Sequence, residues 1–127
     1  MSKSIIREKS FNFALGIIAT YKQLQHEREY VLSKQLLRSG TSIGANVEEA
    51  LAAQSRKDFL AKMSIASKEA RESRYWIILL QTSQITNVKL DLLLEKVNEL
   101  NRMLTSIVKT MAESASATQN SKLKTQN

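Results

Sequence analysis

Apolar side chains recur along this chain at alternating steps of four and three residues, the spacing that places side chains on one face of an α-helix. Four stretches keep this spacing, and short polar segments separate them. We therefore predict helices over about residues 4–25, 30–53, 56–83 and 90–111. The positions predicted to face the core are Ile6, Ser10, Phe13, Ile17, Thr20 and Leu24, then Leu36, Gly40, Ile43, Val47 and Ala50, then Phe59, Met63, Ala66, Ala70, Ser73, Ile77, Leu80 and Gln84, and finally Leu93, Val97, Leu100, Leu104, Ile107 and Met111.

The second stretch carries two conflicting signals. Gly40, Thr41, Ser42, Gly44 and Asn46 are poor helix formers, and this composition favours a loop. The apolar spacing through the same residues favours a helix. We predict the helix because tertiary packing often overrides local propensity. Small side chains on its buried side would let neighbouring backbones approach closely, so we expect this segment to be the central contact surface of the fold.

Local signals support these boundaries. Ser55 stands three residues before Asp58, and in this arrangement the serine oxygen caps a helix while the carboxylate favours its positive end. Residues 85–89 are predicted to form a turn. Four such helices with short connections predict an all-α fold, an antiparallel up-and-down left-handed four-helix bundle over residues 1–111. Beyond this bundle the apolar periodicity is lost, and we expect residues 112–127 to form a polar, frayed or disordered tail.

Composition narrows the class of protein. The chain has 127 residues, no proline, no cysteine and three glycines. The absence of cysteine excludes a disulfide framework and a thiolate zinc site. The first residues lack the continuous apolar run of a secretory signal, and no stretch approaches the roughly 20 apolar residues of a membrane span. We expect a cytoplasmic protein that does not bind membranes.

The chain also lacks the side chains that usually build catalytic centres. Its single histidine, His26, falls in a predicted loop, which excludes the paired Glu-x-x-His motifs of di-iron bundles. No Ser-His-acid set is available beyond His26. Gly40 and Gly44 follow no strand, so they do not form a phosphate-binding loop. We therefore expect a protein that is not an enzyme and has no catalytic residue, cofactor or metal.

One polar cluster lies beside the apolar stripe of the second helix. Ser42, Asn46 and Glu49 are spaced by four and three residues. They could form either a hydrogen-bond network that fixes helix register or part of a ligand site. We favour the structural network.

The net charge of +7 is the strongest functional lead, since clustered Lys and Arg gain from counterion release on nucleic acid. Residues 112–127 hold two Lys and one Glu, a net of +1, so the body carries the other +6. A run of charge can also be only a solvated face. In a ring of identical subunits, however, weak phosphate contacts would add through multivalency. The candidate nucleic-acid-binding residues are Lys34, Arg38, Lys57, Lys68, Arg71 and Arg74.

Surplus apolar surface predicts self-association. Phe11, Leu15 and Ile18 make a second stripe on the first helix, and residues 75–80 are apolar nearly all round. Such surface must be buried on more than one side or remain an exposed patch. The candidate interface residues are Phe11, Tyr75, Trp76 and Ile78.

Three motifs carry a family resemblance. They are Arg-Ser-x-x-Ser-Ile-Gly-Ala-Asn at residues 38–46, Lys-Asp-Phe at 57–59 and Glu-x-x-Tyr-Trp at 72–76. With the segments around them they resemble the bacterial four-helix bundle family encoded by intervening sequences in 23S ribosomal RNA genes. That family is similar to the accessory variability determinants of diversity-generating retroelements. The resemblance covers about residues 11–111, and it departs at 48–50, where Glu-Glu-Ala stands in place of the usual Ala-Glu-Gly.

The resemblance implies a four-helix protomer that assembles into a ring-shaped homopentamer with a basic surface. For the retroelement relatives it also implies binding to nucleic acid and to a reverse transcriptase, whereas the mechanism of the intervening-sequence branch, which this chain resembles more, is not established. Our leading hypothesis is a homo-oligomeric nucleic-acid-binding scaffold, with RNA favoured. The alternative is a protein-interaction adaptor that docks a partner enzyme, such as a reverse transcriptase, through an apolar surface.

Overall fold

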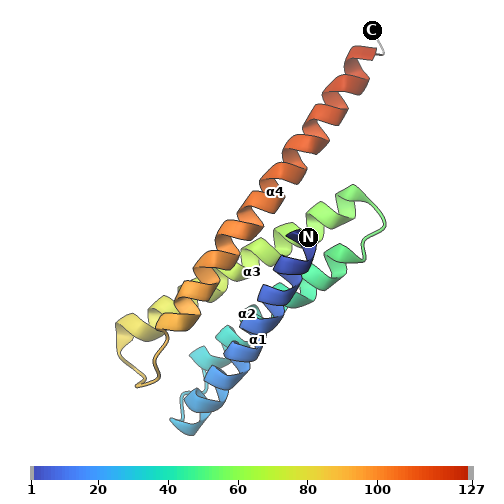
Figure 1. Cartoon of the computed structure of the whole chain (residues 1–127). Helices are drawn as coiled ribbons and strands as arrows, with labels where there is room; N and C mark the ends of the chain where they lie inside the picture. The colour runs from blue at the N-terminus through green and yellow to red at the C-terminus, as the bar shows by residue number, and fades with distance from the viewer. Residues whose placement is uncertain (1, 126–127) are drawn as a thin grey trace.

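The computed structural model describes residues 2–125, and this part of the chain forms four α-helices and no strand. Figure 1 shows each helix running antiparallel to the one before it. This confirms the all-α fold with four helices. The elements are α1 (Ser2–His26), α2 (Leu32–Leu51), α3 (Arg56–Ser83) and α4 (Asp91–Thr125).

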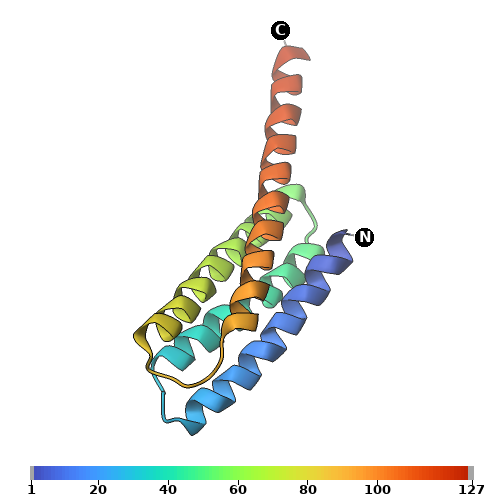
Figure 2. The same cartoon turned by 60° about the vertical axis from the view of Figure 1, so that its left-hand side comes forward.

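The helices pack as a closed set of neighbours, α1 on α2, α2 on α3, α3 on α4 and α4 on α1. The contact between α1 and α4 is the least extensive, and Figure 2 shows α4 rising clear of the other helices past the start of α1. The described helices include none that is long and apolar enough to cross a membrane. We call the contact between two neighbouring helices a seam. The α1/α2, α2/α3 and α3/α4 seams are extensive, and the α1/α4 seam opens at the end where α4 leaves α1.

The predicted core is confirmed at most positions, from Ile6 to Leu104, where side chains are fully or almost fully buried. Phe59, Ile107 and Met111 are only half-buried, because they lie at the end of the bundle where α4 leaves α1. Gln84 is exposed and was wrongly placed in the core; it ends α3 with a left-handed φ of 56°.

The prediction of a helix through the glycine-containing stretch is confirmed, since α2 covers Gly40 and Gly44. A Cβ atom on Gly40 would lie 2.6 Å from Cγ1 of Ile17 on α1. A Cβ atom on Gly44 would lie 3.4 Å from the backbone oxygen of Ser10. The small residues thus allow α1 and α2 to approach closely, and packing outweighs the low helix propensity of glycine.

Among the described residues, side chains cap the start of α2 and of α3. The predicted cap on α3 is confirmed, with Ser55 Oγ accepting from the Asp58 N–H at 3.0 Å. The cap on α2 was not predicted: the Glu29 carboxylate accepts from the N–H groups of Leu32 at 2.9 Å and Ser33 at 2.6 Å. Burial of this carboxyl opposes its ionisation, but the backbone hydrogen bonds outweigh that effect and lower the pKa of Glu29 below 4.5. These bonds explain why α2 begins at Leu32 rather than near residue 30.

The predicted end of the last helix near Met111 is wrong, because α4 continues to Thr125. The loss of apolar periodicity marks the end of the bundle rather than the end of the helix. Residues 112–125 contain neither glycine nor proline, so no residue type in this segment terminates the helix. The last two positions of the predicted tail, 126 and 127, lie outside the described residues.

Candidate nucleic-acid interface

The predicted basic residues occupy two helices and differ in their surroundings. On α3, Lys57, Lys68, Arg71 and Arg74 are all exposed. The first three form no ion pair within the described part of the chain, whereas Arg74 donates from Nε to Oδ1 of Asn98 on α4 at 2.9 Å. Arg74 thus has a neutral partner, and all four exposed cations can reach an anionic ligand.

Arg38 on α2 is instead held by two carboxylates of α3. Its guanidinium pairs with Glu69 at 3.2 Å and also with Glu72. The bond with Glu72 raises the pKa of Arg38. The Trp76 indole donates to Glu72 Oε2 at 3.0 Å and, together with Arg38, lowers the pKa of the Glu72 carboxyl. Arg38 therefore bridges α2 and α3, while Lys34, also on α2, is exposed.

The acidic residues of α3 share the side that faces α2. Lys62 contacts Glu49 of α2 at 3.2 Å, and Glu69 and Glu72 contact Arg38 of the same helix. Asp58 precedes Lys62 by four residues and so falls on the same stripe. The outer and α4-facing sides of α3 are left with cations.

The structure corrects the predicted polar network. Asn46 Nδ2 donates to the backbone oxygen of Ser42 at 2.8 Å, and Ser42 Oγ donates to the backbone oxygen of Arg38 at 2.6 Å. Glu49 is exposed and pairs with Lys62, so the three side chains do not form one buried network. Ser42 and Asn46 do lie near each other on α2, but each donates to a backbone carbonyl of that helix.

A buried polar pair that the sequence analysis missed lies one turn away. The hydroxyls of Ser39 on α2 and Ser73 on α3 are 2.9 Å apart, and both side chains are fully buried. Each hydroxyl also lies within hydrogen-bond distance of a carbonyl of its own helix, Ser39 of Leu36 and Ser73 of Glu69, so the pair adds a polar link between α2 and α3 to bonds made within each helix. Ser73 appeared in the sequence only as a small residue in an apolar stripe.

The four predicted interface residues do not form one surface. Phe11 on α1 is 62% exposed, and Tyr75 on α3 is 58% exposed. Trp76 and Ile78 are half-buried, and Trp76 meets the Tyr75 ring edge-on with 5.1 Å between ring centroids. Because α1 and α3 are not neighbours in the bundle, Phe11 and Tyr75 belong to two separate surfaces.

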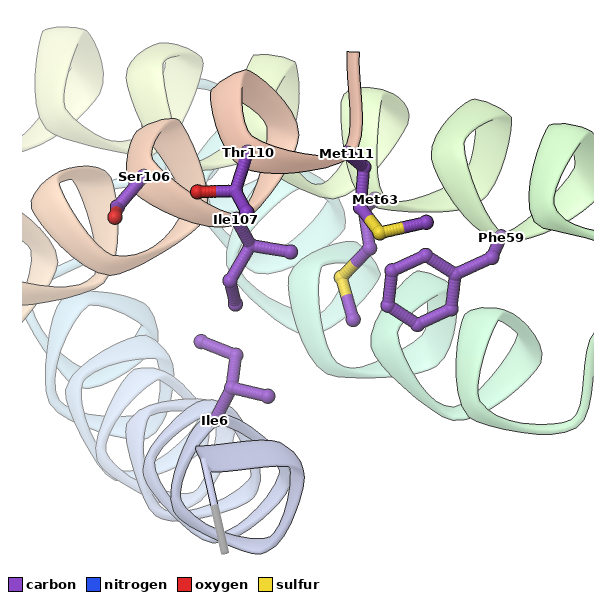
Figure 3. Close-up of a pocket in the computed structure, with 7 residues that line it drawn as sticks. All are labelled: Ile6, Phe59, Met63, Ser106, Ile107, Thr110 and Met111. Atoms are coloured by element: carbon purple, nitrogen blue, oxygen red, sulfur yellow. The ribbon is translucent and has the colours of Figure 1, made fainter. Parts of the chain in front are cut away.

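The bundle also has an apolar pocket of about 320 Å³ at its open end, drawn in Figure 3. Ile6 and Ile107 point toward each other across it, and Met63 and Phe59 form one side. The lining carries no titratable side chain, and its polar groups are the hydroxyls of Ser106 and Thr110. Within the described residues, no group of three or more His, Cys, Asp or Glu side chains could hold a metal ion.

Comparisons with known proteins give this architecture a family. The profile of the 23S rRNA-intervening sequence protein family matches residues 2–106. Among solved structures, the chain is similar to a protein of unknown function from the S23 ribosomal protein family of Bacteroides thetaiotaomicron VPI-5482. The two share 47% sequence identity with a TM-score of 0.79, over 86% of this chain and 99% of that chain. No curated protein matches. The chain therefore belongs to the 23S rRNA-intervening sequence protein family.

Proposed function

We propose that this protein is a non-enzymatic, homo-oligomeric scaffold that binds nucleic acid, RNA in preference, through the outward basic face of α3. The observation that carries the proposal is the set of exposed cations on this helix, where the Glu69 and Glu72 carboxylates pair with Arg38 of α2. Phosphate contacts from such a face would be electrostatic and largely independent of sequence. Lys34 on α2 adds a further exposed cation.

The test is binding of a labelled structured RNA and of a matched duplex DNA across a salt series, on protein whose solution mass is known. We expect a steep loss of affinity with salt and tighter binding of the RNA. The variant with Lys68, Arg71 and Arg74 changed to Glu should lose binding and keep its helical circular dichroism. A charge-matched control changes three other exposed lysines, Lys22, Lys89 and Lys96, to Glu. Unchanged affinity in the first variant would exclude the α3 face.

Assembly into a homo-oligomer is part of the same proposal. The exposed apolar stripe of Phe11, Leu15 and Ile18 on α1 supports it, because isolated soluble protomers seldom leave such a stripe uncovered. A pentamer is what the family resemblance implies. Light scattering that gave the mass of a single chain at tens of micromolar would contradict the assembly.

The same stripe favours a second candidate function, an adaptor that docks a partner enzyme through its apolar surface. Capture of partners from lysate after nuclease treatment separates the two functions, because an RNA binder loses its companions and an adaptor keeps them. Changing Phe11 and Leu15 to Asp should abolish capture by an adaptor. Partners that survive nuclease and depend on these two residues would favour the adaptor over the scaffold.

A further inference from the structure

The four seams between neighbouring helices differ in how their charges are paired. Within the described residues, ion pairs join α1 to α2, α1 to α4 and α2 to α3. Between α3 and the described side chains of α4 there is no ion pair. The cations that reach across this seam hydrogen-bond to neutral groups, Arg74 to Asn98 at 2.9 Å and Arg56 to Ser114 at 3.4 Å. Across the α3/α4 seam these two cations thus have neutral partners, and the carboxylate of Asp91 on α4 accepts from Gln81 of α3 at 3.0 Å.

The α4 side of this seam adds two cations that the sequence analysis did not single out. Arg102 and Lys109 are exposed, and they follow Asn98 by four and eleven residues, which places them on the helix face that Asn98 presents toward α3. That face carries no carboxylate between Asn98 and Lys109, while Asp91 and Glu95 precede this span and Glu113 follows it. The nearby Glu99 is turned toward α1, where Lys9 contacts it at 2.9 Å.

The two side-chain contacts define how α3 and α4 run past each other. Arg74 meets Asn98 at one end, and Arg56 meets Ser114 at the other, so the two antiparallel helices lie side by side between these points. At 1.5 Å per residue, the distance from residue 98 to residue 114 is about 24 Å. One strand of a duplex places a phosphate every ~3.4 Å along the helix axis, so this track spans about seven base pairs.

From this arrangement we propose that a double-stranded nucleic acid lies along the α3/α4 seam, and that Arg102 and Lys109 contact its phosphates together with Arg71 and Arg74. The inference rests on the proposed function; it adds that the binding surface is the α3/α4 seam and that the ligand is double-stranded. The seam is straight and rigid because both of its sides are helices, so it can lie against backbone phosphates on one side of a duplex.

Aromatic residues argue for a duplex rather than a single strand. Proteins that bind single strands combine a basic groove with several aromatic rings on which successive bases stack. In the described part of the chain, the exposed ring next to this row is Tyr75, which already packs edge-on against Trp76. One ring at one end of the track does not provide a stacking platform.

The test compares a labelled RNA hairpin duplex with a single strand of the same composition. Changing Arg102 and Lys109 to Gln should weaken duplex binding about tenfold or more and flatten the slope of log affinity against log salt by about two. The matched control changes Lys22 and Lys96 to Gln. Lys96 shares the α1-facing side of α4 with Glu99, three residues later, so this control removes the same charge away from the seam. The conservative variant Arg102→Lys with Lys109→Arg should bind as the unchanged protein does.

Three results would overturn the inference, and they are distinguishable from each other. If the Gln variant binds like its control while the α3 triple variant loses binding, the surface assignment is wrong and the proposed function stands. If the single strand binds as tightly as the duplex, the proposal that the ligand is double-stranded is wrong. If the unchanged protein binds neither RNA at low salt, both the inference and the proposed function fail.

Discussion

The close approach of α1 and α2 predicts opposite effects of the same substitution at two neighbouring glycines. Gly40→Ala would place a methyl group 2.6, 2.9 and 3.0 Å from three side-chain carbons of Ile17. Ile17 is β-branched and fully buried, so it cannot turn its side chain away without disturbing the core. Gly44→Ala meets atoms of Ser10 no closer than 3.4 Å, which is ordinary contact.

The magnitudes follow from two opposing terms. Replacing glycine by alanine inside a helix stabilises it by about 1 kcal/mol, and overpacking a core costs about 1–3 kcal/mol. At Gly44 the helix term acts nearly alone, so we expect stabilisation of about 0.5–1 kcal/mol. At Gly40 three contacts of 3.0 Å or less place the overpacking cost in the upper part of its range, about 2–3 kcal/mol, so we expect a net loss of about 1–2 kcal/mol.

Urea unfolding followed by circular dichroism at one fixed protein concentration measures both changes as shifts of the midpoint at constant slope. Combining Gly40→Ala with Ile17→Ala gives a direct check of the clash. Because Ile17→Ala removes all three carbons, the double variant should be less destabilised than the sum of the single changes. Equal shifts at Gly40 and Gly44, or additive costs in the double variant, would refute the packing argument.

Two further predictions concern ionisable groups whose pKa is lowered in the folded chain. Glu29→Gln should lower the free energy of unfolding by about 1 kcal/mol at neutral pH. A lowered pKa stabilises the fold only while the carboxyl is ionised, so this difference from the unchanged protein should shrink as pH falls below 4.5. Urea unfolding at two pH values measures this, and a difference independent of pH would contradict it. Trp76 is the single tryptophan, so its emission should change as Glu72 is protonated, below pH 4.5. That step should vanish in Glu72→Gln; its persistence would assign it to another group.

Much of the fold was predictable from the sequence because core positions follow from helix geometry alone. The spacing of apolar residues around Ile17 on α1, around Ile43 on α2 and around Val97 on α4 shows which face of each helix is buried, whatever the neighbouring helix is. The far end of α4 was not predictable in this way, because periodicity reports contact with a bundle and α4 continues without one. The Glu29 cap was missed since glutamate is an unusual capping residue and acts here from three residues before Leu32.

The surface was less predictable, because the partners of a charged residue depend on how neighbouring helices are placed along each other. The sequence places Arg38 one turn from Lys34, but it does not reveal that Glu69 and Glu72 of α3 stand opposite Arg38. Arg102 likewise becomes part of a row only when Asn98 is known to face Arg74.

The distribution of carboxylates explains how a chain of net charge +7 can hold four helices together and still offer cations to a ligand. The described interhelical ion pairs engage Glu48, Glu49, Glu69, Glu72 and Glu99, and all of them lie on seams other than α3/α4. Others act at chain connections, where Glu29 caps α2 and Glu27 accepts from the backbone N–H of Asn87 at 3.2 Å. These carboxylates are used within the fold. On α4, Asp91 accepts from Gln81 of α3 at 3.0 Å, and Glu95 and Glu113 flank the span from Asn98 to Lys109, so it is within that span that a polyanion would meet little competition. Because the ion pairs on the other seams would stay intact, binding there would not require the helices to move.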